Sequence, residues 1–164
     1  MVTFFLMLVE FIQKQHRELR ELFLQHQEAL LQARFEAASA ALQAFRTRLS
    51  AHMALEEQYL FPAFAGIDRK SRWDAGLYAR EHEKINQMYG NIAGELQRLS
   101  EEPGKDSAQR RNIIVLLDKE KTFKGLLEHH EDREEEALLR ELDEQLPEKD
   151  REELVSRLSV AGGG

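Results

Sequence analysis

Apolar residues recur at intervals of three and four along most of the chain, the spacing that places side chains on one face of an α-helix. The pattern is interrupted near residues 35–39, in GIDRKSRWD, and in EEPGKDS at 101–107. It therefore predicts four long helices and a short amphipathic one. The first helix is predicted over about Thr3–Ala33, and the second follows a turn near Phe35–Ser39 and ends near Pro62–Gly66. The third follows the loop GIDRKSRWD and carries apolar residues from Tyr78 to Leu99, the fourth covers about 108–145, and the short helix covers 148–159.

The residues at the breaks have chemistry that begins or ends helices. Ser71 or Asp74 can cap the third helix by accepting a hydrogen bond from one of its free N–H groups. Pro103-Gly104 marks the turn before the fourth helix, and Pro147 ends that helix.

Long helices joined by short connections favour an all-α fold, an antiparallel up-down-up-down four-helix bundle with a short C-terminal helix. We expect the bundle to span residues 1–146 and the short helix with a frayed tail, Gly162–Gly164, to occupy residues 147–164.

The composition limits the chemistry that this fold can carry. The chain has 164 residues, a net charge of −7 and no cysteine. This length is enough for one domain with a buried core. The lack of cysteine excludes disulfides, thiolate metal sites and cysteine nucleophiles, so any metal site must use nitrogen and oxygen ligands. The acidic balance and the scattered basic residues argue against a nucleic-acid surface.

The N-terminal stretch MVTFFLMLVEFIQKQH is strongly apolar. It has no basic n-region and no small-residue cleavage site, and Glu10 ends the apolar run well short of the ~20 residues that span a bilayer. We interpret it as the first turns of a core helix, with a role of Met1–Val9 at a membrane or in an oligomer as a minor alternative. The expected location is the cytoplasm.

Each predicted long helix places a histidine on its apolar face, and two helices add a glutamate one turn later, where i and i+4 share a face. The stripe through HMALEEQYLFP continues from Glu56 to Tyr59 and Ala63. HEDREEEALLR, which begins at 130, repeats its His-x-x-x-Glu-Glu pattern. The inward polar residues are His16, His52, Glu56, His82, His130 and Glu134.

Burying these six side chains without partners would cost several kcal/mol, against a net stability of roughly 5–15 kcal/mol. Metal coordination removes this objection, because ligation compensates buried polar and charged atoms. Imidazole and carboxylate ligands suit iron, manganese or zinc, and four helices around a bundle core suit a di-iron site best. A metal-free scaffold or partner-binding bundle would instead carry leucines at these positions.

Two further histidines are assigned roles outside this set. His129 points about 100° away from His130 on its helix, so we expect it to face solvent or to lie behind a ligand. His26 is expected at the surface, on the flank of its helix, and is the substitute ligand if His16 does not face inward.

Several other polar residues lie close to the apolar faces. Glu57 and Glu135 directly follow the inward glutamates, and we expect them to be exposed or to orient an imidazole. Glu120 is expected to reach water from a helix edge, with an approach to the metal as the alternative. Tyr59 and Tyr89 are expected to pack in the core, with a hydrogen bond to a bound oxygen species as the alternative.

With these residues in place, the sequence resembles the hemerythrin-like (HHE) domains over about Glu10–Leu146. The resemblance rests on QHRELRELF, HMALEEQYLFP, REHEKI and EHHEDREEEALL, in that order. It implies a four-helix bundle around two non-heme irons joined by an oxo or hydroxo bridge, commonly used to bind or sense oxygen. The ligands that it implies are His16, His52, Glu56, His82, His130 and Glu134, with both glutamates bridging the irons.

The chain departs from the oxygen-carrying hemerythrins at two places. Those proteins have His-x-x-x-His on the third helix, where this chain has Asn86 at the second place. They also have His-x-x-x-x-Asp on the fourth helix, where this chain has His-x-x-x-Glu. We expect Asn86 to hydrogen-bond behind a ligand, with weak ligation as the alternative, so that one iron keeps an open or water-filled position.

The resemblance favours a protein that binds or senses oxygen or nitric oxide over an enzyme. The alternatives are a di-iron oxidase or peroxidase-like enzyme and an iron-handling or repair protein, with zinc or manganese as other candidate metals. The expected small ligand is dioxygen or nitric oxide. No nucleic-acid or membrane partner is expected, and the sequence names no protein partner.

Overall fold

The computed structural model describes residues 7–161 of the chain. Every regular element among these residues is a helix, which confirms the predicted all-α class. The predicted helix start at Thr3, most of the segment Met1–Val9 and the frayed tail Gly162–Gly164 lie outside the described residues. Within the described part, no helix is both long enough and apolar enough to cross a membrane.

The first half of the chain forms two long helices. Helix α1 spans Leu8–Leu31, and α2 spans Phe35–Leu55. Helix α2 continues through a five-residue π-helix, η1 (Glu56–Leu60), into the short helix α3 (Phe61–Ala65). An irregular loop then leads to the second half.

The second half repeats this plan. Helix α4 spans Ala75–Glu101, and α5 spans Asp106–Arg133. Helix α5 continues through a second five-residue π-helix, η2 (Glu134–Leu138), into α6 (Leu139–Gln145). A final helix, α7 (Glu148–Ala161), follows Pro147 as predicted.

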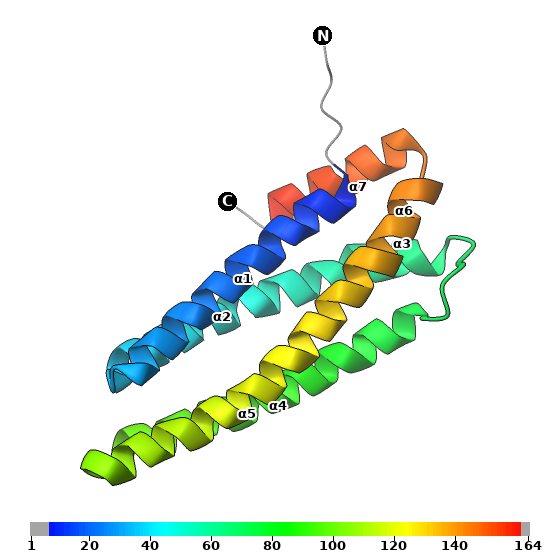
Figure 1. The fold of residues 1–164 in the computed structure, drawn as a ribbon. Coiled ribbons are helices and arrows are strands. Elements are labelled where there is room, and N and C mark those ends of the chain that lie inside the picture. The colour runs from blue at the N-terminus through cyan, green and yellow to red at the C-terminus, as the bar shows by residue number, and fades with distance from the viewer. Residues whose placement is uncertain (1–6, 162–164) are drawn as a thin grey trace.

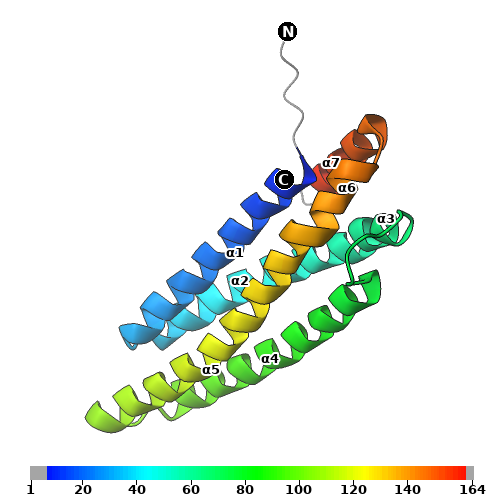
Figure 2. The same cartoon turned by 45° about the vertical axis from the view of Figure 1, so that its right-hand side comes forward.

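The long helices form a bundle of two side-by-side pairs (Figure 1). Helix α1 lies along α2, and α4 lies along α5, in both views (Figure 2). Helix α7 folds back beside the first part of α1 (Figure 1). The chain therefore consists of two helix pairs packed together, and we call them the first pair (α1 and α2) and the second pair (α4 and α5).

The start of α1 is fixed by a side chain from the other end of the sequence. The two carboxylate oxygens of Asp143, on α6, accept hydrogen bonds from the backbone N–H groups of Leu8 at 2.9 Å and Val9 at 3.1 Å. The first N–H groups of a helix have no partner within the helix and need such an acceptor. This contact joins the first helix to α6 at one end of the bundle.

The helix boundaries confirm one predicted cap and correct one predicted turn. The side chain of Asp74 caps α4 by accepting a hydrogen bond from the N–H of Leu77 at 2.9 Å. Helix α2 begins at Phe35, inside the region predicted as a turn. The turn prediction was wrong because residues 32–34 suffice for the connection, with Ala33 in the left-handed region at φ 56°.

Buried apolar side chains form two clusters along the bundle, and a histidine on each long helix marks the boundary between them. Residues on either side of each histidine belong to different clusters. The flanking pairs are Ile12 and Leu19 around His16, Leu55 and Leu49 around His52, Tyr78 and Ile85 around His82, and Leu138 and Leu127 around His130. The four histidines therefore form a polar layer between two apolar layers.

The π-helix η1 shifts the apolar stripe predicted for this part of the chain. Sequence spacing placed Tyr59 and Ala63 on the inner face. In the structure Leu60 and Phe64 are buried there, and Tyr59 and Ala63 are only partly buried against them. A π-turn holds one residue more than an α-turn, so the apolar face resumes one residue later than α-helical spacing predicts.

Candidate metal centre

The six inward residues predicted from the sequence all lie buried in the polar layer, where they form two groups of three. The first group is His16, His52 and Glu134. The second group is Glu56, His82 and His130. Within each group, the atoms able to bind a metal lie within 4.8 Å of one another. We call the two groups together the His/Glu centre.

The two carboxylates link the groups, because each lies near imidazoles of both. Glu56 Oε1 is 2.8 Å from Nε2 of His52, in the first group, and 3.6 Å from Nε2 of His82, in the second. Glu134 Oε1 is 2.8 Å from Nε2 of His130 and 3.8 Å from Nε2 of His16. Each carboxylate thus stands between the two groups.

Each group draws its residues from both helix pairs. The imidazoles of the first group come from α1 and α2, and those of the second group come from α4 and α5. The carboxylates are exchanged, since Glu134 of the first group follows α5 and Glu56 of the second group follows α2. Neither helix pair alone supplies a complete group.

Both carboxylates occupy the first position of a π-helix. The carbonyl of Glu56 accepts the backbone N–H of Phe61, and the carbonyl of Glu134 accepts that of Leu139, so both bonds join residues five apart. Short π-helical turns inside α-helices occur frequently at functional sites. The structural repeat of the two segments agrees with the repeated His-x-x-x-Glu-Glu pattern in the sequence.

The electrostatics of the centre favour neutral imidazoles at two positions and an anion at Glu56. Burial lowers the pKa of His16 and His130 below the ordinary value. Burial also acts to lower the pKa of His52 and His82, but the neighbouring Glu56 outweighs it and raises both. In turn, burial acts to raise the pKa of Glu56, and the contacts with His52 and His82 hold it well below its usual range.

Many polar atoms of the centre have no hydrogen-bond partner. The buried atoms without a hydrogen-bond partner include both oxygens of Glu56, both oxygens of Glu134 and both ring nitrogens of His16. The close contacts that these atoms make within the centre lack the alignment of hydrogen bonds. Buried polar groups are almost always hydrogen-bonded or bound to a metal. Imidazole nitrogens and carboxylate oxygens that converge in this way fit divalent or trivalent cations with nitrogen and oxygen ligands.

The outer nitrogen, Nδ1, of each imidazole faces an oxygen atom behind the centre. His82 Nδ1 is 2.9 Å from Glu57 Oε1, and His16 Nδ1 is 3.8 Å from Glu135 Oε1. Glu57 is half exposed and Glu135 is partly buried, and both lie where the sequence predicted them to orient an imidazole. Such contacts fix the ring orientation and the tautomer of a metal-binding histidine.

The other two outer partners were not predicted. His52 Nδ1 is 2.7 Å from Gln15 Oε1, and His130 Nδ1 is 3.6 Å from Glu81 Oε1. Glu81 is held in turn by Arg133, whose Nε lies 3.3 Å from Glu81 Oε1. Gln15 and Glu81 each directly precede an inward histidine in the sequence. This position is the sequence signal that could have identified them.

A buried carboxylate, Glu131, lies beside the first group. Its Oε2 accepts hydrogen bonds from Arg20, the shorter at 2.7 Å, while its Oε1 is buried without a partner. Burial raises the pKa of Glu131 to about 7, although the contact with Arg20 acts in the opposite direction. This residue was also not predicted from the sequence.

Two predictions about polar residues are wrong, and for the same reason. His26 was placed at the surface and Glu120 at a helix edge reaching water, but both are fully buried. His26 Nε2 lies 2.6 Å from Glu120 Oε1, and His26 Nδ1 lies 2.8 Å from the carbonyl of Ala38. His26 and Glu120 Oε1 pair with each other inside the bundle, which permits polar side chains on an apolar face, although Glu120 Oε2 is buried without a partner.

The contacts of His26 fix the roles of its two ring nitrogens. A carbonyl oxygen only accepts, so His26 Nδ1 carries a hydrogen and donates it to Ala38. Nε2 of the same ring faces the Glu120 oxygen at 2.6 Å. His26 lies ten residues from His16 on α1, about 15 Å along the helix, so the pair is separate from the His/Glu centre.

The prediction that Asn86 lies behind a ligand is also wrong. Asn86 is exposed, and its side-chain oxygen accepts a hydrogen bond from Arg46 at 2.7 Å. His129 is exposed, as predicted. Tyr89 packs against Phe45 in the core, and its hydroxyl donates to a backbone carbonyl of α2, so it takes no part in the His/Glu centre.

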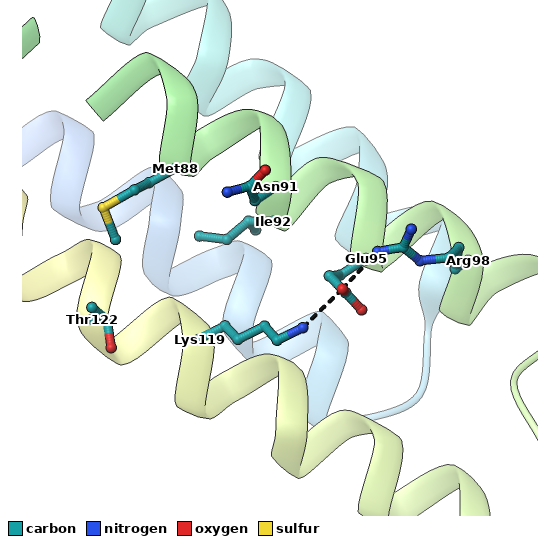
Figure 3. A pocket seen from close by; sticks show the side chains of 7 residues that line it. All are labelled: Met88, Asn91, Ile92, Glu95, Arg98, Lys119 and Thr122. Carbon is teal, nitrogen blue, oxygen red and sulfur yellow. Dashed lines mark hydrogen bonds and ion pairs between the residues drawn. The ribbon is translucent and has the colours of Figure 1, made fainter. Parts of the chain in front are cut away.

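A groove of about 450 Å³ runs between α4 and α5 away from the His/Glu centre (Figure 3). Its walls include Met88 and Ile92, and Glu95 crosses it to an ion pair with Lys119 at 2.8 Å. None of the six inward residues lines it. The groove is a surface feature distinct from the candidate metal centre.

Comparison with known proteins supports the metal-binding interpretation. A scan against protein-family models matches residues 7–142 to the hemerythrin HHE cation-binding domain. Comparisons with curated proteins and with solved structures give no match. The matched range contains both groups of the His/Glu centre and ends before α7. The chain belongs to the hemerythrin HHE cation-binding domain family.

Proposed function

We propose that the His/Glu centre binds two iron ions, one at each group, and that the chain binds or senses dioxygen or nitric oxide there. The observation that carries the proposal is the position of the two carboxylates. Glu56 and Glu134 each lie within 2.8–3.8 Å of an imidazole from each group, and none of their oxygens has a hydrogen-bond partner. This is the placement required of bridging ligands.

The protein residues would divide the work of holding the metals. His16 and His52 would bind the ion at the first group through Nε2, and His82 and His130 would bind the ion at the second. Four imidazoles and two carboxylates without thiolate suit iron, as they also suit zinc or manganese, and family membership favours iron. Bound iron would supply the redox chemistry needed to take up a diatomic gas.

The proposal includes the order of the helices. Short connections at residues 32–34 and 102–105 join the members of each pair, which supports an antiparallel up-down-up-down bundle over the first 146 residues, followed by a short C-terminal helix. Such a bundle brings one ligand-bearing segment from each long helix to the same level.

The proposal is tested by metal analysis and gas binding on one sample. Purified chain is loaded with ferrous salt without oxygen, and iron per chain is measured by mass spectrometry. The reduced sample is then exposed to nitric oxide, and separately to air, while its optical spectrum is followed. We expect two irons per chain and a new absorption with each gas. A chain that takes up zinc or manganese but no iron would reject the iron assignment. Two bound irons with no spectral change on exposure to either gas would reject the gas-binding role.

A further inference from the structure

We infer that Gln15 makes the two metal positions unequal, so that the first group holds its ion less tightly than the second. The inference rests on the proposed function, since it concerns the ions that the His/Glu centre is proposed to bind. It is drawn from the four atoms that face the outer nitrogens of the four imidazoles.

Three of the four imidazoles face a carboxylate, and His52 alone faces a neutral amide. His52 Nδ1 lies 2.7 Å from Gln15 Oε1. An imidazole that binds a metal through Nε2 carries its hydrogen on Nδ1 and must donate it, so the oxygen of the Gln15 side chain, not its NH₂ group, has to face the ring. The short contact is consistent with this arrangement.

The chemical difference between the partners bears on metal affinity. A carboxylate that accepts from Nδ1–H bears a full negative charge, which raises the basicity of the imidazole and strengthens Nε2 as a ligand. An amide oxygen orients the ring equally well but contributes only a dipole. His52 is therefore positioned as firmly as His82 but polarised less.

The second group includes the one imidazole of the four whose Nδ1 lies within hydrogen-bond distance of a carboxylate, His82. Glu57 accepts from His82 at 2.9 Å, and Glu81, held in place by Arg133, lies 3.6 Å from His130 Nδ1. In the first group, His16 has its carboxylate, Glu135, at 3.8 Å and not in hydrogen-bond contact. Neither His16 Nδ1 nor His130 Nδ1 has a hydrogen-bond partner, so these two rings do not distinguish the groups. The carboxylate partner of His82, set against the amide partner of His52, points toward weaker binding at the first group.

The experiment titrates the metal-free chain with cobalt(II) and follows the visible absorption and the heat of binding. Cobalt is redox-stable in air and reports nitrogen and oxygen coordination. We expect two binding steps of different affinity in the natural sequence. Gln15→Glu, which is isosteric, should tighten the weaker step by about 10–100-fold and leave the tighter step nearly unchanged.

A matched control and a reciprocal variant separate this effect from general charge and folding effects. Gln25→Glu adds the same charge on an exposed position of the same helix and should alter neither step. Glu57→Gln gives His82 an amide partner and should weaken the tighter step, by less because Glu57 is half exposed.

The outcomes distinguish this inference from the proposed function. Two equal steps in the natural sequence, or equal responses to Gln15→Glu and Gln25→Glu, would overturn the inequality while leaving the two-metal centre intact. Binding of no metal by the natural sequence would overturn the proposed function and the inference together. A changed melting temperature of the metal-free Gln15→Glu chain with no change in the weaker step would show that Gln15 has a structural role only.

Discussion

The Nε2 atoms of His82 and His130 lie 3.1 Å apart, although the two residues are carried by different helices and are separated by 47 intervening positions in the sequence. Two ring nitrogens at this distance can share one proton or converge on one metal ion. In the absence of a metal one ring must donate to the other. A cation between them would replace that hydrogen bond by two ligand bonds, so the pair is set to accept an ion with little rearrangement.

Removing one imidazole should empty one metal position. His16 belongs to the first group alone, and neither of its nitrogens has a hydrogen-bond partner. We expect His16→Ala to lower the iron content from two to about one per chain, because the second group keeps its three ligands. The iron-loaded variant should also melt at a lower temperature than the loaded natural chain. Iron analysis and calorimetry of the loaded samples measure both effects.

The matched control for this variant is His129→Ala, which removes an exposed imidazole next to His130. It should retain both irons. If the two variants bind the same amount of iron, the assignment of His16 as a ligand is wrong.

The buried pair of His26 and Glu120 should show strong coupling. Replacing either one by leucine leaves the other buried without a partner, which typically costs about 3–5 kcal/mol of unfolding free energy. Replacing both by leucine removes the pair and should cost much less than the sum of the single changes. Denaturant unfolding of the metal-free chains measures the cycle.

Iron content should stay unchanged in the chains that fold, because the pair lies about 15 Å along the helix from His16. If the losses of unfolding free energy in the two single variants add up to that of the double variant, His26 and Glu120 are not coupled. If iron is lost, the pair is not independent of the His/Glu centre.

Asn86→His should leave metal and gas binding unchanged, although it restores the His-x-x-x-His pattern of the oxygen carriers. The side chain at 86 is exposed and hydrogen-bonded to Arg46, so a new imidazole would face solvent. Iron content and the nitric oxide spectrum are the measurements. A third-helix ligand gained by this change would appear as an altered spectrum and would contradict the exposed position of residue 86.

The contact of Asp143 with the start of α1 should stabilise the bundle independently of metal. Asp143→Ala leaves the N–H groups of Leu8 and Val9 without their acceptor and should lower the unfolding free energy by about 1–3 kcal/mol. Glu144→Ala, on the next and exposed residue, provides the control. Equal unfolding midpoints for the two variants would mean that the contact contributes nothing measurable.

Much of the fold and the centre could be predicted from helical spacing alone. The stripe Leu42, Phe45, Leu49, His52 and Glu56 repeats every three or four residues, and all five side chains are buried. Because periodicity reports the direction of a side chain from its helix, it correctly indicated that the polar members of the stripe point inward.

The same rule, applied more strictly, identifies two of the errors. His26 continues the stripe of Leu19, Phe23 and Leu30 at the spacing of buried residues, although it was predicted to lie on the flank of its helix. Asn86 follows the buried Ile85 by one position and so turns away from the core. Partners from distant helices, such as Glu120 for His26, depend on tertiary contacts that a single helix does not encode.

The π-helices were beyond this kind of reasoning. A π-turn changes the spacing rule itself, so α-helical periodicity fails by one residue after Glu56 and predicts Tyr59 where Leu60 is buried. The outer hydrogen bonds of the imidazoles depend on side-chain rotamers, which spacing does not determine.

Each helix pair supplies the carboxylate of the other pair's group. In this respect the single chain resembles an assembly of two subunits, each of which completes the site of the other. Either pair, produced as a separate polypeptide, would present two imidazoles for one ion and one carboxylate aimed at the other. Two such fragments, or two copies of one fragment, would have to meet before either ion found its full set. If the His/Glu centre binds metal as proposed, metal uptake would require the two halves to dock, and an ion at either position would link the two helix pairs.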